Sequence, residues 1–220
     1  MKSKMLFTLA ILALICFSCK KKSTESTSSS KPDFTQLKVG NYWVYEVYKV
    51  DTNGVETDQN KTDSSYILKD TLINGIQYFV KISSSFPFSR STNPLMPPDT
   101  TCLRDSAGYL LEHTWNGGSL IVFARDNFKD VFLSDSIDNL ALRQIRMTGK
   151  DSVVNVPAGT FITRSLCLIL YPLHPNYPWG IRKYFYIYGS GVGQIKFTFG
   201  FYSEPDHYEA QLVRYHVGKP

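Results

Sequence analysis

Residues 34–220 are divided into short segments rich in aromatic and β-branched side chains, separated by turn signals. The clearest pair, residues 66–72 and 77–83, flanks Asn74-Gly75, a dipeptide that accepts the positive φ angles of a tight type I′ hairpin turn. Turns this short join neighbouring antiparallel strands. Strands do not alternate with helices along the chain, so the pattern excludes Rossmann and TIM-barrel folds.

The same pattern predicts the remaining strands. They are expected at residues 42–50, 66–72, 77–83, 101–105, 109–115, 119–125, 140–148, 152–155, 161–170, 181–188, 194–202 and 208–217, about twelve in all. Only residues 126–139 are expected to hold a helical turn. We therefore expect residues 34–220 to form an all-β domain, a single strongly curved antiparallel sheet with the shape of a half-barrel or open barrel and little helix.

Two of these segments are apolar or aromatic at nearly every position. Residues 161–171 and 181–188 lack the alternation of a strand with one face in water, so both faces should be covered. The domain core can cover one face. The loops 83–99 or 171–180, or a ligand in the concavity, can cover the other.

The N-terminus has the features of a targeting segment. Lys2 and Lys4 precede an almost wholly apolar run from Met5 to Phe17, the charged and hydrophobic regions of a secretory signal. The run is too short to cross the hydrocarbon core of a bilayer, about 30 Å thick, as a helix. Residues 1–18 are therefore expected to be a signal peptide.

The end of this run resembles a bacterial lipoprotein signal, in which a small residue precedes the cysteine that receives lipid. Ser18 is small, so Cys19 fits that position, whereas Cys16 follows the bulky Ile15 and should be discarded with the signal. The resemblance implies three acyl chains on Cys19, among them palmitate, enough for stable membrane anchoring. It also implies the envelope of a Gram-negative bacterium. Lysines rather than acids follow Cys19, which favours the outer membrane with the body facing the periplasm.

Residues 19–33 carry lysines, serines and threonines but no aromatic residue, so we expect a disordered tether. Six of the 24 basic and two of the 19 acidic residues lie in residues 1–33, which leaves 18 basic against 17 acidic residues in the body. The net charge of +5 thus belongs to the signal and tether. A nearly neutral body gives no electrostatic support to nucleic-acid binding.

Three segments carry a second resemblance: LKVGNYWVY at residues 37–45, VPAGTF at 156–161 and YGSGVGQIK at 188–196. Together they resemble a group of uncharacterised bacterial envelope lipoproteins that has no agreed activity. By looser analogy to lipoprotein carriers of the LolA kind, the resemblance implies a curved antiparallel sheet with an apolar concave face. It bears on the fold more than on the function.

Enzyme signatures are lacking. The four histidines, His113, His174, His207 and His216, do not have the spacing of a helical zinc motif. The sequence contains no nucleophile elbow and no P-loop, and its glycine-rich stretch at residues 189–193 lies between β patterns, without the helix that would hold a phosphate. We expect no catalytic residue, metal or cofactor.

Two cysteines remain after removal of the signal, Cys102 and Cys167. An oxidising envelope permits a disulfide between them. The alternative is two buried apolar thiols in separate strands, since free cysteine packs well as a small hydrophobic side chain.

The loop 171–180 is the most suggestive for binding, because three prolines stiffen a segment that carries His174, Tyr177 and Trp179. It is a candidate binding loop, or alternatively an aromatic loop folded over the open end of its own sheet. Two functions stay open for the chain as a whole: binding of an apolar or amphiphilic ligand in the curved sheet, or a non-catalytic docking or structural role with an envelope protein partner.

Overall fold

The computed structural model describes residues 33–84, 99–114 and 116–218, and Pro32–Pro220 form one compact unit. Twelve strands and no helix occur in the described residues. The strands are β1 (Tyr42–Val50), β2 (Glu56–Ile73), β3 (Ile76–Ser83), β4 (Asp99–Ser106), β5 (Tyr109–His113), β6 (Ser119–Ala124), β7 (Val131–Ile137), β8 (Ala141–Val156), β9 (Gly159–Pro172), β10 (Arg182–Gly189), β11 (Gly193–Phe199) and β12 (His207–His216).

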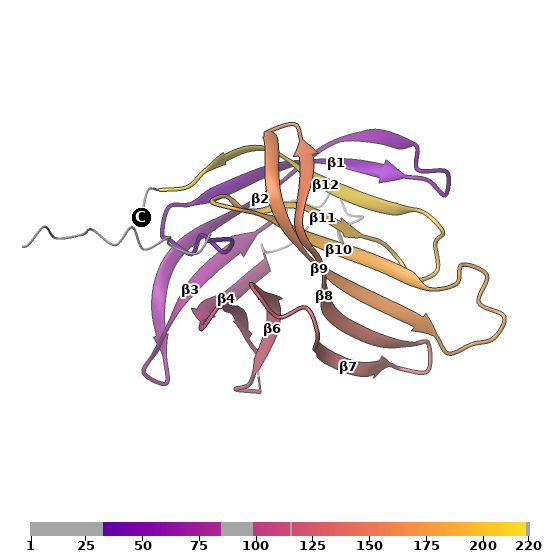
Figure 1. Ribbon diagram of the computed structural model, residues 1–220, viewed down its shortest axis with the longest axis horizontal. Helices are drawn as coiled ribbons and strands as arrows, with labels where there is room; N and C mark the ends of the chain where they lie inside the picture. The colour runs from indigo at the N-terminus through magenta and orange to yellow at the C-terminus, as the bar shows by residue number, and fades with distance from the viewer. Residues whose placement is uncertain (1–32, 85–98, 115, 219–220) are drawn as a thin grey trace, which may run out of the picture. The chain divides into compact units, whose positions relative to one another are not determined.

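All twelve strands belong to one antiparallel sheet, as expected (Figure 1). Its order is β6-β5-β4-β3-β2-β1-β12-β11-β10-β9-β8-β7. Two meanders, β1 to β6 and β7 to β12, are therefore joined side by side by the β1–β12 ladder, in which Val47 pairs with Ala210. The edges of the sheet are β6 and β7, which follow one another in the chain. The sheet curves strongly and almost closes on itself at this seam, but no ladder between the two edges occurs in the described residues.

Several predicted strand limits are corrected. Residues 131–137, within the segment where a helical turn was expected, form strand β7. The two strands expected at 140–148 and 152–155 are one strand, β8, interrupted by bulges at Met147/Gly149 and Lys150/Ser152. Strand β2 begins at Glu56, earlier than predicted. The total of twelve agrees because one strand was missed and another was counted twice.

The predicted Asn74-Gly75 hairpin is present between β2 and β3, and both residues have positive φ angles, 51° and 76°. Ala107-Gly108 makes the same kind of turn between β4 and β5, with φ angles of 53° and 87°. Two-residue turns with this geometry match the right-handed twist of the flanking strands. They explain why this half of the sheet follows the chain order without a crossover.

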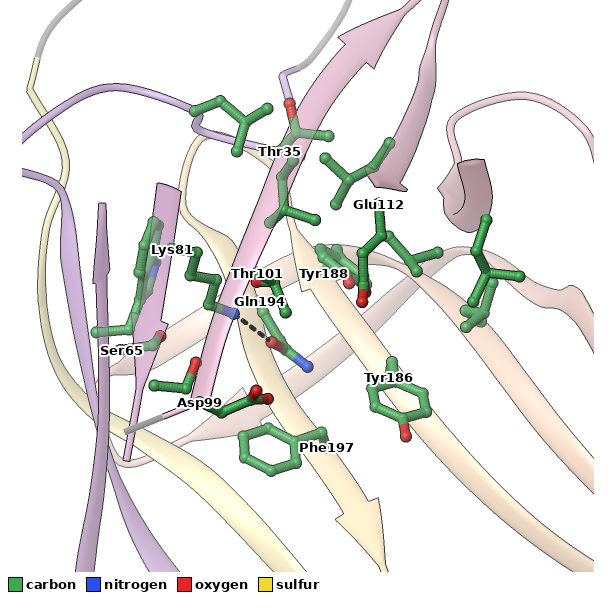
Figure 2. Close-up of a pocket in the computed structure, with 18 of the residues that line it drawn as sticks. Thr35, Ser65, Lys81, Asp99, Thr101, Glu112, Tyr186, Tyr188, Gln194 and Phe197 are labelled. Atoms are coloured by element: carbon green, nitrogen blue, oxygen red, sulfur yellow. Dashed lines mark hydrogen bonds between the residues drawn. The ribbon is translucent and has the colours of Figure 1, made fainter. Parts of the chain in front are cut away.

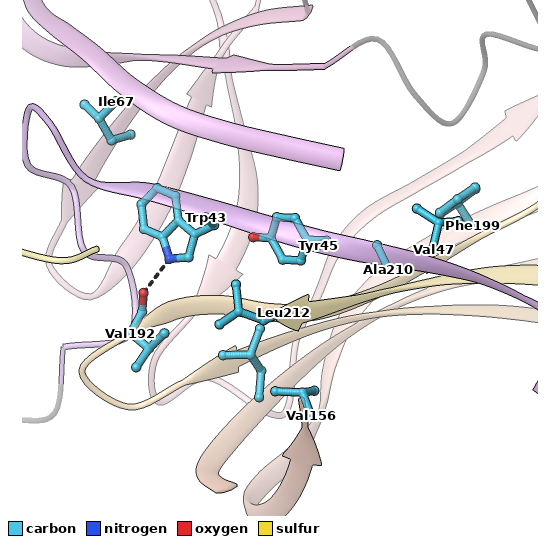
Figure 3. Close-up of a cluster of buried hydrophobic side chains, with 10 residues drawn as sticks. Trp43, Tyr45, Val47, Ile67, Val156, Val192, Phe199, Ala210 and Leu212 are labelled. Carbon is cyan, nitrogen blue, oxygen red and sulfur yellow. Dashed lines mark hydrogen bonds between the residues drawn. The ribbon is translucent and has the colours of Figure 1, made fainter. Parts of the chain in front are cut away.

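Residues from the three recognised segments meet in one hydrophobic cluster (Figure 3). The indole Nε1–H of Trp43 donates a hydrogen bond to the carbonyl of Val192 at 2.7 Å. Gly193 must be glycine, because its φ is 97° and a Cβ there would lie 3.1 Å from the Trp43 ring. Val156 packs into the same cluster, beside the β8–β9 turn. The three segments thus pack strands that are distant in the sequence against one another, which is a structural role.

The expectation that both faces are covered holds for residues 163–171 but not for the whole of the two segments, because Ile162 is 57% and Ile181 54% exposed and Lys183 is exposed as well. Neighbouring residues on a strand point to opposite faces, yet Leu166 and Cys167 are both buried, and so are Ile169 and Leu170. On the concave side, Leu166 joins a second cluster with Phe34, Phe123 and Tyr188.

Candidate functional site

The concave side of the sheet is hollow. A cavity of about 840 Å³ lies against it, lined by residues of β1 to β6 and β8 to β11 (Figure 2). Ligand sites of small molecules typically occupy about 300–1,000 Å³. The volume therefore suits a small molecule of moderate size.

The two sides of the cavity differ in chemistry. Its ionisable wall comes from consecutive strands: Asp63 on β2, Lys81 on β3, Asp99 on β4 and Glu112 on β5. The β-ladders set this arrangement, because Lys81 pairs with Thr101, two residues from Asp99, and Leu103 pairs with Glu112. Apolar residues of the same meander, among them Ile67, Leu103, Leu110 and Val122, line this side as well. The facing wall, from β8 to β11, is mainly apolar and aromatic, with Ile145, Leu166, Leu168, Tyr186, Tyr188 and Phe197, and also carries Arg143 and Gln194.

Lys81 reaches across the interior. Its Nζ donates a hydrogen bond to Oε1 of Gln194 at 3.4 Å (Figure 2). Gln194 lies at the start of β11, and three strands separate β3 from β11 in the sheet order. The bond therefore spans the hollow rather than following the sheet, and it places the ammonium group inside the cavity.

Burial perturbs the acids of this wall. It raises the pKa of Asp63 to about 7, although the backbone N–H of Ser64, 2.6 Å from Oδ1, and the charge of Lys81 act in the opposite direction. Burial also raises the pKa of Glu112, and the carboxylate of Asp99 adds to the effect. Burial lowers the pKa of Lys81, against the attraction of the three acids. Such shifts occur where charge is held away from water, as in many binding and catalytic sites.

The residues that precede β1 help to fill the interior of the sheet. Phe34 is buried against Phe123, with ring centroids 6.0 Å apart. The guanidinium of Arg164 lies 4.9 Å from the centre of the Phe34 ring, and its Nη1 donates to Asp126 at 2.6 Å. Asp126 belongs to the connection between β6 and β7. Arg164 thus contacts both the connection between β6 and β7 and the segment that precedes β1.

The predicted binding loop lies away from these cavity residues. Tyr177 stacks on Tyr202 with centroids 4.2 Å apart, and its hydroxyl donates to the carbonyl of Tyr202. The backbone N–H of Asn176 donates to Nδ1 of His174, and Trp179 is 42% exposed. None of His174, Tyr177 and Trp179 lines the cavity. Tyr177 follows the alternative of a loop folded onto its own sheet, whereas Trp179 faces outward.

Cys102 on β4 and Cys167 on β9 are both free. The two strands are not neighbours in the sheet, and the possible disulfide is not formed in this structure. The two thiols lie in separate strands, as in the alternative, but only Cys167 is buried, and Cys102 is partly exposed. Burial raises the pKa of the Cys167 thiol to about 11, which makes it a poor nucleophile at neutral pH. The predicted lipidation site, Cys19, lies outside the described residues.

The four histidines lie elsewhere: His113 packs on Tyr78, His216 stacks on Tyr42, and His207 faces Glu209. None of them lines the cavity. Within the described ranges, no group of three or more histidine, cysteine, aspartate or glutamate residues is placed to hold a metal ion. The described part of the chain also has no helix that is long and apolar enough to cross a membrane.

Comparison with known families and with curated proteins finds no match. Two solved structures are similar in outline. One is a Bacteroides fragilis protein provisionally described as exported and as having a YmcC-like fold, with a TM-score of 0.47 and 10% identity over 84% of this chain and 99% of that one. The other is provisionally described as a lipoprotein of Parabacteroides distasonis, with a TM-score of 0.48, 12% identity and the same coverage. Likenesses this distant define neither a family nor a function.

Proposed function

We propose that this protein is a non-catalytic envelope lipoprotein that binds an amphiphilic ligand inside its curved sheet. The observation that supports the proposal is the cavity of about 840 Å³, which has an ionisable wall and a facing apolar wall. A cavity with these two walls suits a ligand that has both an apolar body and a polar group. The same fold with a filled interior would offer no such site.

Anchoring by lipid on Cys19 completes the proposal and has its own test. A Cys19→Ala chain should lose labelling by a radioactive or clickable fatty acid, because the modified thiol is gone. The Cys16→Ala chain is the matched control and should be labelled and processed normally. Labelling that survives Cys19→Ala contradicts the anchor.

Binding is tested with a neutral, apolar fluorescent probe, N-phenyl-1-naphthylamine, and the chain from Lys20 to Pro220, which keeps every described residue. We expect saturable binding at one site per chain. Leu168→Gln places an amide on the apolar wall and should weaken binding about tenfold, because the probe cannot satisfy the buried amide. Fluorescence titration measures both affinities.

Leu72→Gln is the control, because Leu72 is 71% exposed near the β2–β3 turn and does not line the cavity. It should bind the probe like the unaltered chain. Circular dichroism and thermal melting confirm that both variants fold. Absence of saturable binding, or an equal loss in both variants, contradicts the proposed function.

One observation favours the second candidate, a docking or structural role with an envelope protein. Three large apolar residues are exposed on the segment between β9 and β10: Leu173 at 53%, Trp179 at 42% and Ile181 at 54%. Apolar side chains that gather on a surface mark many protein interfaces. This role becomes the better explanation if the cavity takes no ligand.

A further inference from the structure

The charges that line the cavity do not balance. Arg143 on β8 is already matched, since its Nε and Nη2 form a two-pronged pair with Asp135 at 2.9 Å and 2.6 Å. Among the described residues that line the cavity, three carboxyl groups then remain, on Asp63, Asp99 and Glu112, against the ammonium group of Lys81. When these groups are ionised, the cavity carries an excess of negative charge.

One buried polar group in the cavity also lacks a partner. Ser65 is 4% exposed and lines the cavity, yet its Oγ makes no hydrogen bond within the described part of the chain. Glu112 extends its carboxyl group into the hollow (Figure 2). Buried polar groups normally have hydrogen-bond partners, and leaving one unpaired costs free energy. A ligand with hydrogen-bond donors would supply the missing partner of Ser65 and could also donate to the carboxylate of Glu112.

Aromatic rings lie close to these acids. Tyr45 is directly opposite Asp63 in the β1–β2 ladder, and Tyr186, Tyr188 and Phe197 line the facing wall. The faces of aromatic rings attract cations, and the attraction grows when water is excluded. Carboxylates together with aromatic rings form a setting for an organic cation, whereas a carboxylate or phosphate group would meet repulsion from three acids.

We propose that the ligand carries a positively charged amine, which lies among Asp63, Asp99 and Glu112 while its apolar chain lies against Leu166 and Leu168. This inference rests on the proposed function, because it names the polar group of the same ligand. Lys81 holds Gln194 and limits the excess negative charge of the empty cavity. It is not the anchor of an anionic head group.

Binding of such a ligand depends on pH. The ionisable groups that line the cavity around the amine are Asp63, Lys81, Asp99 and Glu112 from β2 to β5, Tyr45 from β1, Tyr186 and Tyr188 from β10, and Arg143 from β8, which is paired with Asp135. Burial holds the pKa of Asp63 at about 7, so this acid is largely protonated at pH 6 and largely ionised at pH 8. An alkylamine, with a pKa of about 10, keeps its charge over this range. Affinity for the amine should therefore rise with pH.

The test compares three probes with the same twelve-carbon chain: dodecylamine, dodecanol and dodecanoate. Each displaces N-phenyl-1-naphthylamine from the chain Lys20 to Pro220, below its micellar concentration. At pH 8 we expect dodecylamine to bind about tenfold more tightly than dodecanol, and dodecanoate to bind most weakly. Between pH 8 and pH 6 the affinity for dodecylamine should fall about threefold or more, while that for dodecanol stays constant.

Variants of the acids test whether their charges cause the preference for dodecylamine over dodecanol. Glu112→Gln keeps the shape and removes one charge, so it should reduce the preference for dodecylamine over dodecanol by about threefold or more. Asp99→Asn is a second variant with the same expected direction. Asp70→Asn is the control, because it removes a charge from an exposed residue of β2 outside the cavity.

The outcomes separate the two proposals. Equal binding of all three probes, or a preference for dodecanoate, overturns the amine proposal and leaves ligand binding intact. Saturable binding of none of the probes overturns both. A preference for dodecylamine that is unchanged in Glu112→Gln and in Asp99→Asn, or that falls equally in Asp70→Asn, shows that these two cavity acids do not hold the amine, which also overturns the amine proposal.

Discussion

Single side chains decide where the interior of the sheet is filled and where it is hollow. In one cluster, large residues such as Phe123 and Met147 are buried and fill part of the interior. In the cavity, small polar residues, Ser65, Ser83 and Thr101, occupy inward positions of β2, β3 and β4. A short side chain leaves volume that a leucine would fill, so the hollow follows from residue size.

The state of Asp63 sets the first prediction at this scale. The acid is 5% exposed and burial raises its pKa to about 7, so the folded state binds a proton more tightly than the unfolded state. The free energy of unfolding should then fall as pH rises from about 4 to about 7. Asp63→Asn removes the charge and should raise the free energy of unfolding at pH 8 by about 1–3 kcal/mol.

Urea denaturation at pH 4 and pH 8 measures the effect. Near pH 4, where Asp63 is protonated in the folded state and only partly ionised in the unfolded state, the variant should differ little from the unaltered chain. The exposed Asp70→Asn serves as control and should change stability by less than about 0.5 kcal/mol at either pH. A loss of stability in Asp63→Asn at pH 8 would show that the ionised carboxylate is well compensated, in contradiction to the prediction.

At the scale of elements, the pattern of apolar residues predicted most strands. It missed the strands, or parts of strands, that are ordered mainly by hydrogen bonding to a neighbouring strand. Strand β2 begins in the polar stretch ETDQNKTDSS, where pairing with β1 supplies the order that composition does not. Strand β7 pairs only with β8 at the edge of the sheet, so its weak pattern resembles a loop. Strand β8 looks interrupted at residues 149–151 because bulges occur there and Asp151 has a φ of 53°.

A concave face was expected, but as an apolar one, and the ionisable wall of the cavity could not be predicted from the sequence for a related reason. An ionisable residue in a strand is normally assigned to the solvent face, and Asp63, Lys81 and Glu112 have the spacing of surface residues. Their inward direction is fixed by the β-ladders, and a shift of one residue would turn them outward. The loop of His174, Tyr177 and Trp179 was predicted as a binding loop because its prolines and aromatic residues are close together in the sequence. The ionisable residues of the cavity are far apart in the sequence and form no such pattern.

At the scale of the whole molecule, the sheet is held by the pairing of its first and last strands and is open between its middle ones. Strand β1 pairs with both β2 and β12, and β12 pairs with both β1 and β11. Among the strands of the described residues, β6 pairs only with β5, and β7 only with β8. Stability should therefore be highest at the junction of the two meanders and lowest at the seam.

Hydrogen exchange measured by mass spectrometry tests this difference. Amides of β6 and β7 should exchange about tenfold or more faster than those of β1 and β12, because strands paired on one side open without disturbing the rest of the sheet. Strands β4 and β9, each paired on both sides, provide an internal reference within each meander. The measurement uses protein without ligand. If the amides of β6 and β7 are as well protected as those of β1 and β12, hydrogen bonds close the seam in solution, and the prediction of a weak, open seam is wrong.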